Sequence, residues 1–320
     1  MANSGASAAP LVTVITATYN WSSVLYYAIQ SVLWQTFQEW EMWVIGDACT
    51  DDSEAVVTSF NDPRVHWYNR LDNAGNQWLP NNDGLARARG KYIAYLGHDD
   101  LWYPTHLESL VEAIERVDAD LAYSVIEWVG APGTGIRCVM GINSDKLLQP
   151  RAAPSSVLHR HELIEKIGPW KDYRTLNQTP DIEFFQRIWA YQKRFINTNQ
   201  LTAFKFPSGW RVNSYRERRS DEQAEYVRRI QIEPDFLANE LFAIVEAYVA
   251  GKAAFPNLSA PADAGSGWKI DYYRKLRGLE AKAPLPDLAA TGINRRRVVR
   301  PIRILLRRIL GKLLQIVGTP

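Results

Sequence analysis

Apolar runs and amphipathic segments alternate through the first 125 residues of the chain. Short runs rich in β-branched and aromatic residues, each ended by polar or turn-forming residues, predict strands at 11–17, 41–46, 65–68, 91–96 and 120–124. Between them, apolar residues recur at helical spacing, which predicts helices at 21–35, 52–60, 82–89 and 104–117. This alternation predicts an α/β fold with a mostly parallel, Rossmann-like central sheet flanked by helices.

The pattern changes after residue 125. Patterning there predicts a turn at 130–135, a strand at 155–159, a short helix at 161–167 and an amphipathic helix at 181–191. Helical spacing then dominates 217–280, with an interruption rich in Pro, Gly, Ala and Ser at 256–267. We expect a disordered N-terminus at 1–10, a domain over 11–215 made of the parts 11–125 and 126–215, and a helical extension over 216–290.

The net charge of +2 hides an asymmetry along the 320 residues. Eight basic residues follow Asp287, the last acidic residue, which leaves 29 basic against 35 acidic residues before that point. In 291–320, aliphatic residues share one helical face and arginines the other: Ile302, Leu305, Leu306, Ile309, Leu313 and Ile316 against Arg303, Arg307 and Arg308. Such a basic amphipathic helix binds an anionic membrane surface. The alternative is that its apolar face packs on protein.

Composition restricts the compartment. No run of about 18 apolar residues predicts a membrane-spanning helix, and the small polar residues at the start lack the features of a signal peptide. Cys49 and Cys138 are too few for a disulfide framework and suit a reducing cytoplasm. We therefore expect a cytoplasmic protein held peripherally at the inner face of the membrane. Nucleic acid is not an expected partner, because aliphatic rather than aromatic side chains alternate with the arginines.

Polar side chains follow three of the predicted strands. Tyr19 follows the first strand, Asp47 the second, and Asp99 and Asp100 the fourth. The carboxyl ends of parallel strands meet at one edge of a sheet, where such sheets bind ligands. A lone carboxylate can accept from a base or a ribose, and a carboxylate pair can hold Mg²⁺ or Mn²⁺ on a diphosphate. The alternative for the pair is that it caps the helix that begins near Pro104.

These motifs bring a known family into view. The chain resembles family 2 glycosyltransferases with the GT-A fold over roughly 10–125, and less specifically to about 210. The matching pieces in order are Val14-Ile-Thr-Ala-Thr-Tyr-Asn20, Ser31-Val-Leu-Trp-Gln-Thr-Phe37, the segments 40–47, 49–52, 73–75, 88–100 and 102–104, and the weaker matches 158–160, 167–170 and 179–183. No glycine-rich phosphate loop accompanies them, which argues against a dinucleotide or P-loop enzyme.

The resemblance implies a nucleotide-sugar site at the strand ends. Ala17 and Tyr19 would line it, and Asp47 would contact the base. Asp99 and Asp100 would fill the metal-binding acid motif, with Asp100 favoured as the direct ligand of Mn²⁺ or Mg²⁺. Gly97 stands where many family members carry a further acid. Two more residues are candidates for donor binding: Asn82 and Arg211, the latter from a loop that could close over the diphosphate or else form a solvated basic face.

The resemblance also implies a general base on the acceptor side. Asp181 matches the acid that deprotonates the acceptor hydroxyl in many members, with Glu183 as the second candidate. The alternative for Asp181 is a plain helix-start acid in Thr179-Pro-Asp-Ile-Glu183. The tryptophans at 102, 170 and 210 could stack on sugar rings, although most of the twelve must simply pack.

The expected activity is transfer of a sugar, with inversion and a divalent metal, in surface polysaccharide or glycolipid synthesis. The resemblance favours a UDP-sugar as donor and a glycan or a lipid-linked sugar as acceptor. Two alternatives remain. A nucleotidyltransferase would need a glycine-rich phosphate loop after the first strand, which is absent. A non-catalytic sugar-nucleotide-binding or scaffold subunit of a membrane-associated complex would need no general base.

Overall fold

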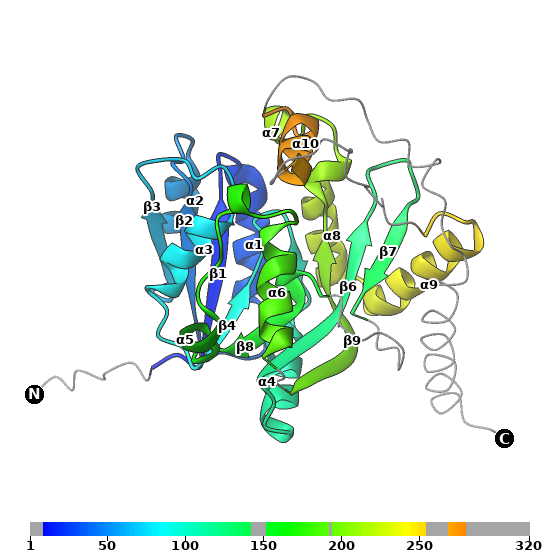
Figure 1. Cartoon of the computed structure of the whole chain (residues 1–320). Coiled ribbons are helices and arrows are strands. Elements are labelled where there is room, and N and C mark those ends of the chain that lie inside the picture. The colour runs from blue at the N-terminus through cyan, green and yellow to red at the C-terminus, as the bar shows by residue number, and fades with distance from the viewer. Residues whose placement is uncertain (1–8, 142–151, 192–193, 254–267, 280–320) are drawn as a thin grey trace, which may run out of the picture.

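The computed structural model describes residues 9–141, 152–191, 194–253 and 268–279. The strands are β1 (Val12–Thr18), β2 (Trp40–Gly46), β3 (Val65–Asn69), β4 (Tyr92–Tyr95), β5 (Leu101–Trp102), β6 (Leu121–Val129), β7 (Arg137–Met140), β8 (Val157–Arg160) and β9 (Phe195–Lys205) (Figure 1). The α-helices are α1 (Ser22–Leu33), α2 (Ser53–Ser59), α3 (Trp78–Leu85), α4 (His106–Arg116), α5 (Leu163–Ile167), α6 (Pro180–Ala190), α7 (Ser214–Glu217), α8 (Asp221–Ile232), α9 (Phe236–Val249) and α10 (Trp268–Leu276). Single 3₁₀ turns form at Pro154–Ser156, Tyr173–Thr175 and Ser208–Trp210.

The strands of the described residues form one mixed sheet in the order β3-β2-β1-β4-β8-β6-β9-β5, with β7 paired to β6. The first four strands are parallel, since β1 pairs parallel to β2 and β4, and β2 pairs parallel to β3. β8 runs antiparallel between β4 and β6, and β9 runs parallel to β6. The predicted α/β fold with a mostly parallel sheet is therefore confirmed.

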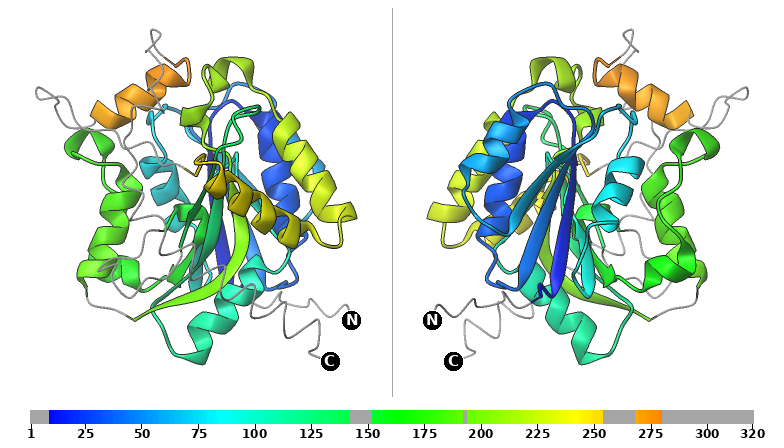
Figure 2. Two further views of the ribbon diagram at one scale, coloured as in Figure 1. Left: turned by 90° about the vertical axis from the view of Figure 1, so that its right-hand side faces the viewer. Right: turned by 90° about the vertical axis from the view of Figure 1, so that its left-hand side faces the viewer.

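Helices cover both faces of this sheet (Figure 2). On one face, α1 and α4 bury aliphatic residues such as Leu25 and Leu110 against Val12 and Val14 of β1. On the other, α3, α5 and α6 pack against Ile15 and its neighbours. Alternate residues of β1 thus serve opposite cores, as the twofold repeat of a strand requires. This double burial explains why β1 is an almost unbroken apolar and β-branched run.

The helical extension packs on the part of the sheet formed by β6 and β9. Tyr226 and Val227 of α8 and Phe236 and Ile244 of α9 share a buried cluster with Phe204 of β9. An ion cluster joins the same elements, because Arg137 of β7 pairs with Glu127 of β6 and Glu240 of α9. The extension is therefore integrated with the sheet and does not form a separate core.

Several element boundaries differ from the predictions. The helix predicted at 82–89 begins earlier, at Trp78, and the strand predicted at 120–124 continues to Val129. Strands β5, β7 and β9 were not predicted. The tail at 291–320 lies outside the described residues, as does most of the N-terminal segment, so both remain predictions. In the four described ranges, no helix is long and apolar enough to span a bilayer.

Candidate active site

The ends of β1, β2 and β4 lie along one edge of the sheet, as their parallel pairing predicts. A histidine joins two of these ends, because His98 after β4 shares a hydrogen bond of 2.8 Å between its Nδ1 and Thr18 Oγ1 of β1. Its Nε2 lies 2.9 Å from the Tyr215 hydroxyl. The Tyr215 ring in turn lies 5.2 Å from Trp21 and 6.3 Å from Tyr19, centroid to centroid. Tyr19 therefore adjoins a wall of aromatic rings that Tyr215 of α7 completes, and Ala17 of β1 lies two residues before Tyr19.

Asp47 is buried at the end of β2 and holds the loop at 73–75. Its Oδ1 accepts from the backbone N–H of Ala74 at 2.8 Å, and its Oδ2 accepts from that of Gly75 at 3.2 Å. The guanidinium of Arg70 lies 3.4 Å from the same carboxylate. Burial raises the pKa of Asp47, and these donors only partly oppose the rise. A contact between Asp47 and a base stays a prediction, but the residue shapes the loop beside which a base would lie.

Asp99 and Asp100 crowd around Gly97 and differ in their partners. Asp100 is fully buried and accepts from Ser155 Oγ, from Lys205 Nζ at 2.9 Å and from the Phe206 N–H at 3.2 Å. The Asp99 carboxylate accepts no hydrogen bond from the described residues. A Cβ atom on Gly97 would lie 2.7 Å from Asp100 Oδ2, so an acid at 97 would not fit without moving Asp100.

Lys205 is the cation of this edge of the sheet. Burial alone would lower the pKa of Lys205, but the carboxylates of Asp100, Asp99 and Asp181 outweigh it and raise the pKa, so the ammonium stays charged. The residue was missed because β9 was not predicted. A lysine inside the apolar run 201–206 is the signal that could have found it.

The acid pair fits a divalent ion that is shared with a diphosphate. No group of three His, Cys, Asp or Glu side chains in the described ranges could hold a metal by itself. Mg²⁺ and Mn²⁺, however, commonly bind through one or two carboxylates plus phosphate oxygens. Asp99 offers oxygens without hydrogen-bond partners, whereas an ion at Asp100 would meet Lys205.

Asp181 and Glu183, the two candidate bases, begin α6 but differ in their contacts. Glu183 accepts from Lys171 at 2.7 Å and from Arg187 Nε at 2.8 Å, which fixes it as a brace of α6. Asp181 is half-buried, and within the described ranges its carboxylate accepts no hydrogen bond. Its charge reaches Lys205 across the site. Of the two acids, Asp181 has the carboxylate that can still accept a proton from a ligand.

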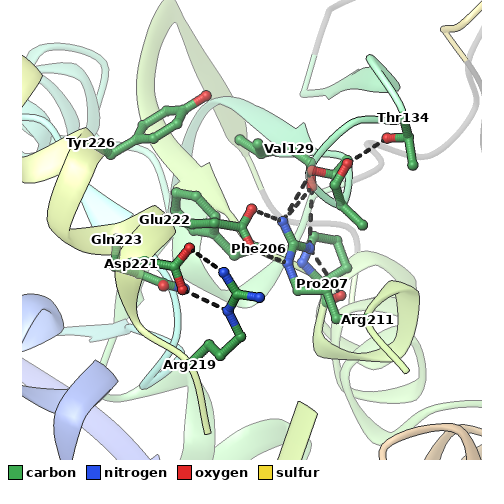
Figure 3. Close-up of polar contacts among 12 residues, drawn as sticks. Val129, Thr134, Phe206, Pro207, Arg211, Arg219, Asp221, Glu222, Gln223 and Tyr226 are labelled. Carbon is green, nitrogen blue, oxygen red and sulfur yellow. Dashed lines mark hydrogen bonds and ion pairs between the residues drawn. The ribbon is translucent and has the colours of Figure 1, made fainter. Parts of the chain in front are cut away.

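Arg211 and Asn82 are both held by the protein. Arg211 donates to both carboxylate oxygens of Glu222, at 2.7 and 2.6 Å, and to the carbonyl of Gly130 (Figure 3). Asn82 exchanges two hydrogen bonds of 2.9 Å with the backbone of Trp170. Their predicted contact with a donor stays untested, but their present bonds join segments of the fold.

The three candidate tryptophans differ in how far they are buried. The Trp102 and Trp170 side chains are 1% exposed, so they pack in the core and cannot stack on a sugar ring. Trp210 is half-buried, and its ring lies 5.6 Å from that of Trp128.

Comparison with known proteins identifies the family of the first half of the chain. The model of the family described as glycosyl transferase family 2 matches residues 13–162, which carry Tyr19, Asp47 and the acid pair. Residues 13–162 therefore belong to glycosyl transferase family 2. Curated relatives share 28% to 31% identity with this chain. One is the putative teichuronic acid biosynthesis glycosyltransferase TuaG of Bacillus subtilis, with 31% identity over 127 residues, 39% of this chain and 50% of that protein.

Solved structures of glycosyltransferases share the fold. The S. aureus TarS fragment 1–349 in complex with UDP matches with a TM-score of 0.50 and 18% identity, over 83% of this chain and 90% of that one. The mannosyltransferase PcManGT from Pyrobaculum calidifontis, in complex with GDP-Man and Mn²⁺, matches with a TM-score of 0.50 and 18% identity, over 77% of each chain. This chain covers between 33% and 67% of the length of the first three curated relatives.

Proposed function

We propose that this enzyme transfers a sugar from a nucleoside-diphosphate sugar to an acceptor hydroxyl, with inversion at the anomeric carbon and with help from a divalent ion. The observation that carries the proposal is the contrast at the start of α6. The Asp181 carboxylate accepts no hydrogen bond from the residues that the structure describes, and its charge reaches Lys205, whereas Glu183 is paired with Lys171 and Arg187.

The reaction follows from the placement of the charges. Asp181 accepts the proton of the acceptor hydroxyl as that oxygen bonds to the anomeric carbon. The bond between this carbon and the diphosphate breaks on the opposite face, and its electron pair leaves on the diphosphate oxygen. Single displacement of this kind inverts the configuration. Asp181 lies in the first turn of α6, outside the strand ends that carry the acid pair, and its charge reaches Lys205, which suits a base on the acceptor side.

On the donor side, the chain's own residues orient the nucleotide. Asp47 and the loop at 73–75 would receive the base, and Ala17 and Tyr19 would flank it. Asp99, together with Asp100, would hold the divalent ion, which neutralises charge on the diphosphate when bound. Lys205 keeps a positive charge beside the same oxygens, and Asp100 holds it there.

The names of similar proteins suggest the class of substrate. TarS was solved with UDP and PcManGT with GDP-Man and Mn²⁺, which supports a UDP- or GDP-sugar as donor and Mn²⁺ as the ion. TuaG is named for teichuronic acid biosynthesis, which supports a glycan or lipid-linked acceptor in surface polysaccharide synthesis.

Ligand-dependent stability tests this proposal. The full chain is heated with UDP, GDP or TDP, with and without Mn²⁺, and the matching sugar nucleotides are then tested for turnover. A ligand at about 100 times its Kd adds about 2.7 kcal/mol to the free energy of unfolding. We expect a shift with one nucleotide that is larger with Mn²⁺, followed by turnover of its sugar. Binding without turnover of any donor would favour a non-catalytic subunit, and no shift in a folded sample would contradict a donor site.

A further inference from the structure

α10 brings the far end of the described chain back to the strand ends. The backbone N–H of Asn213 donates to the Leu276 carbonyl at 2.9 Å, and that of Tyr215 donates to the Arg277 carbonyl at 3.2 Å. Arg274 reaches further and donates to the carbonyl of Gly75, in the loop that Asp47 holds. α7 and α10 accordingly lie together at the end of the sheet where β1 ends (Figures 1 and 2). α10 thus bridges the base side and the aromatic wall of the donor site.

Arg277 directly follows α10 and has a half-buried side chain. Its Nε is buried and finds no hydrogen-bond acceptor among the described residues. Its guanidinium makes no ion pair with the described residues, and its carbon lies 5.9 Å from the centroid of the Tyr215 ring. Burying a donor without an acceptor is costly, because the group loses its water and gains nothing in return. A fold that keeps such a group next to a ligand site points to an acceptor that arrives with the ligand.

The surroundings of Arg277 identify the site that it faces. The Tyr215 ring, whose centroid lies 5.9 Å from Arg277 Cζ, carries the hydroxyl that lies 2.9 Å from His98 Nε2. His98 directly precedes Asp99 in the chain. Arg277 and Asp99 therefore both adjoin the His98–Tyr215 contact, Arg277 through space and Asp99 along the chain.

We propose that Arg277 binds the diphosphate of the sugar nucleotide, opposite the ion held by the acid pair. This inference rests on the proposed function and names a residue outside the segment 13–162 that matches the family. A guanidinium suits the task, because its planar array of donors can bind two phosphate oxygens at once and stays charged at any working pH. The role expected of Arg211 is thereby assigned to a different arginine, since the donors of Arg211 are bound to Glu222 and to backbone carbonyls.

Binding of nucleoside diphosphates and nucleosides to Arg277→Met tests the proposal. Calorimetry would use the full chain with UDP and uridine, and in parallel with GDP and guanosine, in the presence of Mn²⁺. We expect the variant to bind the preferred diphosphate about 10- to 100-fold more weakly, the range for hydrogen bonds to charged groups, and to bind the nucleoside unchanged. Lys275→Met is the matched control, because Lys275 is an exposed cation in the last turn of the same helix. It should bind both ligands like the wild type.

Two results with the variant would overturn the proposal. The first is that Arg277→Met binds the diphosphate with full affinity. The second is that its affinities for the diphosphate and the nucleoside fall by the same factor, which would show that Arg277 is a structural residue. A measurement on the wild type avoids any folding defect of the variant. Hydrogen exchange over 268–279 should slow with the diphosphate and not with the nucleoside, and equal exchange would also contradict the role. If the wild type binds no nucleotide at all, the proposed function itself fails, and this outcome is distinct from the others.

Discussion

Two regions of this molecule bury acidic and basic side chains close together. The regions differ in how many of these side chains are paired with one another. At the junction of β6, β7 and α9, Arg137 pairs with Glu127 and, at 2.6 Å, with Glu240 and the Tyr226 hydroxyl. Arg229 takes the second oxygen of Glu240 at 2.6 Å. At the strand ends, Asp100 is paired with Lys205, but Asp99, Asp181 and Arg277 find no ion-pair partner among the described residues.

The difference separates stability from function. Each charged side chain of the junction is paired with another part of the chain, although Glu127 Oε2 accepts no hydrogen bond from the described residues, and these pairs fix α9 on the sheet. The strand ends hold charges of both signs apart, although pairing them would stabilise the fold. A protein retains such groups where a ligand supplies the missing partners. The comparison predicts that substitutions at the strand ends change activity, whereas those at the junction change stability.

The largest effect is expected for Asp181→Asn. Loss of a general base lowers kcat about 10²- to 10⁴-fold, and the asparagine fills the same space without breaking a bond of the fold. Donor affinity and the melting temperature should stay close to those of the wild type. Glu183→Gln is the matched control, because it should lower the melting temperature through its lost bonds to Lys171 and Arg187, with kcat nearly unchanged. Turnover by Asp181→Asn within tenfold of the wild type would refute the assignment.

Arg137→Met is expected to lower the free energy of unfolding by a comparable amount. Removing this guanidinium leaves Glu127 and Glu240 buried together, and breaking such a pair costs about 3–5 kcal/mol. Denaturant unfolding should show the loss, while the folded fraction should bind the donor with normal affinity. A large change in donor affinity with unchanged stability would reverse the comparison between the two regions.

A smaller effect concerns pH. Burial raises the pKa of Glu127 to about 8, although Arg137 opposes the rise. The folded state therefore keeps a proton that the unfolded chain releases near its ordinary pKa of 4.5. As pH rises between these values, the free energy of unfolding falls by at most about 1.4 kcal/mol per pH unit from this group. Melting of the wild type from pH 5 to pH 9 should thus fall more steeply than that of Glu127→Gln. Parallel curves would show that Glu127 does not titrate in this window.

The sequence was most informative where local pattern and tertiary environment agree. The strands of the first half are apolar runs with clear ends, so both their pairing edge and the position of Tyr19, Asp47 and the acid pair could be predicted. β9 was missed because its polar stretch, Asn197 to Gln200, breaks the expected pattern. Lys205 was missed with it, since a residue cannot be assigned to a site before its strand is recognised.

Partners distant in sequence were beyond prediction. Nothing in the local sequence indicates that Glu222 forms an ion pair with Arg211, or that Lys171 and Arg187 form ion pairs with Glu183. Sequence position alone does not show which candidate side chains are paired within the protein. The folded contacts show that Arg211, Asn82 and Glu183 have partners. Asp181 and Arg277 find no ion-pair partner among the described residues.

The return of α10 to the first strands has a consequence for biosynthesis. β1 to β4 can pair early on the ribosome, but at about 5–20 residues per second the segment around Arg277 follows them by roughly ten seconds or more. Contacts of such long sequence separation also form late in folding. A nascent or truncated chain that ends before α10 therefore lacks the contacts that this segment makes with Gly75, Asn213 and Tyr215. These contacts can form only after translation has passed α10.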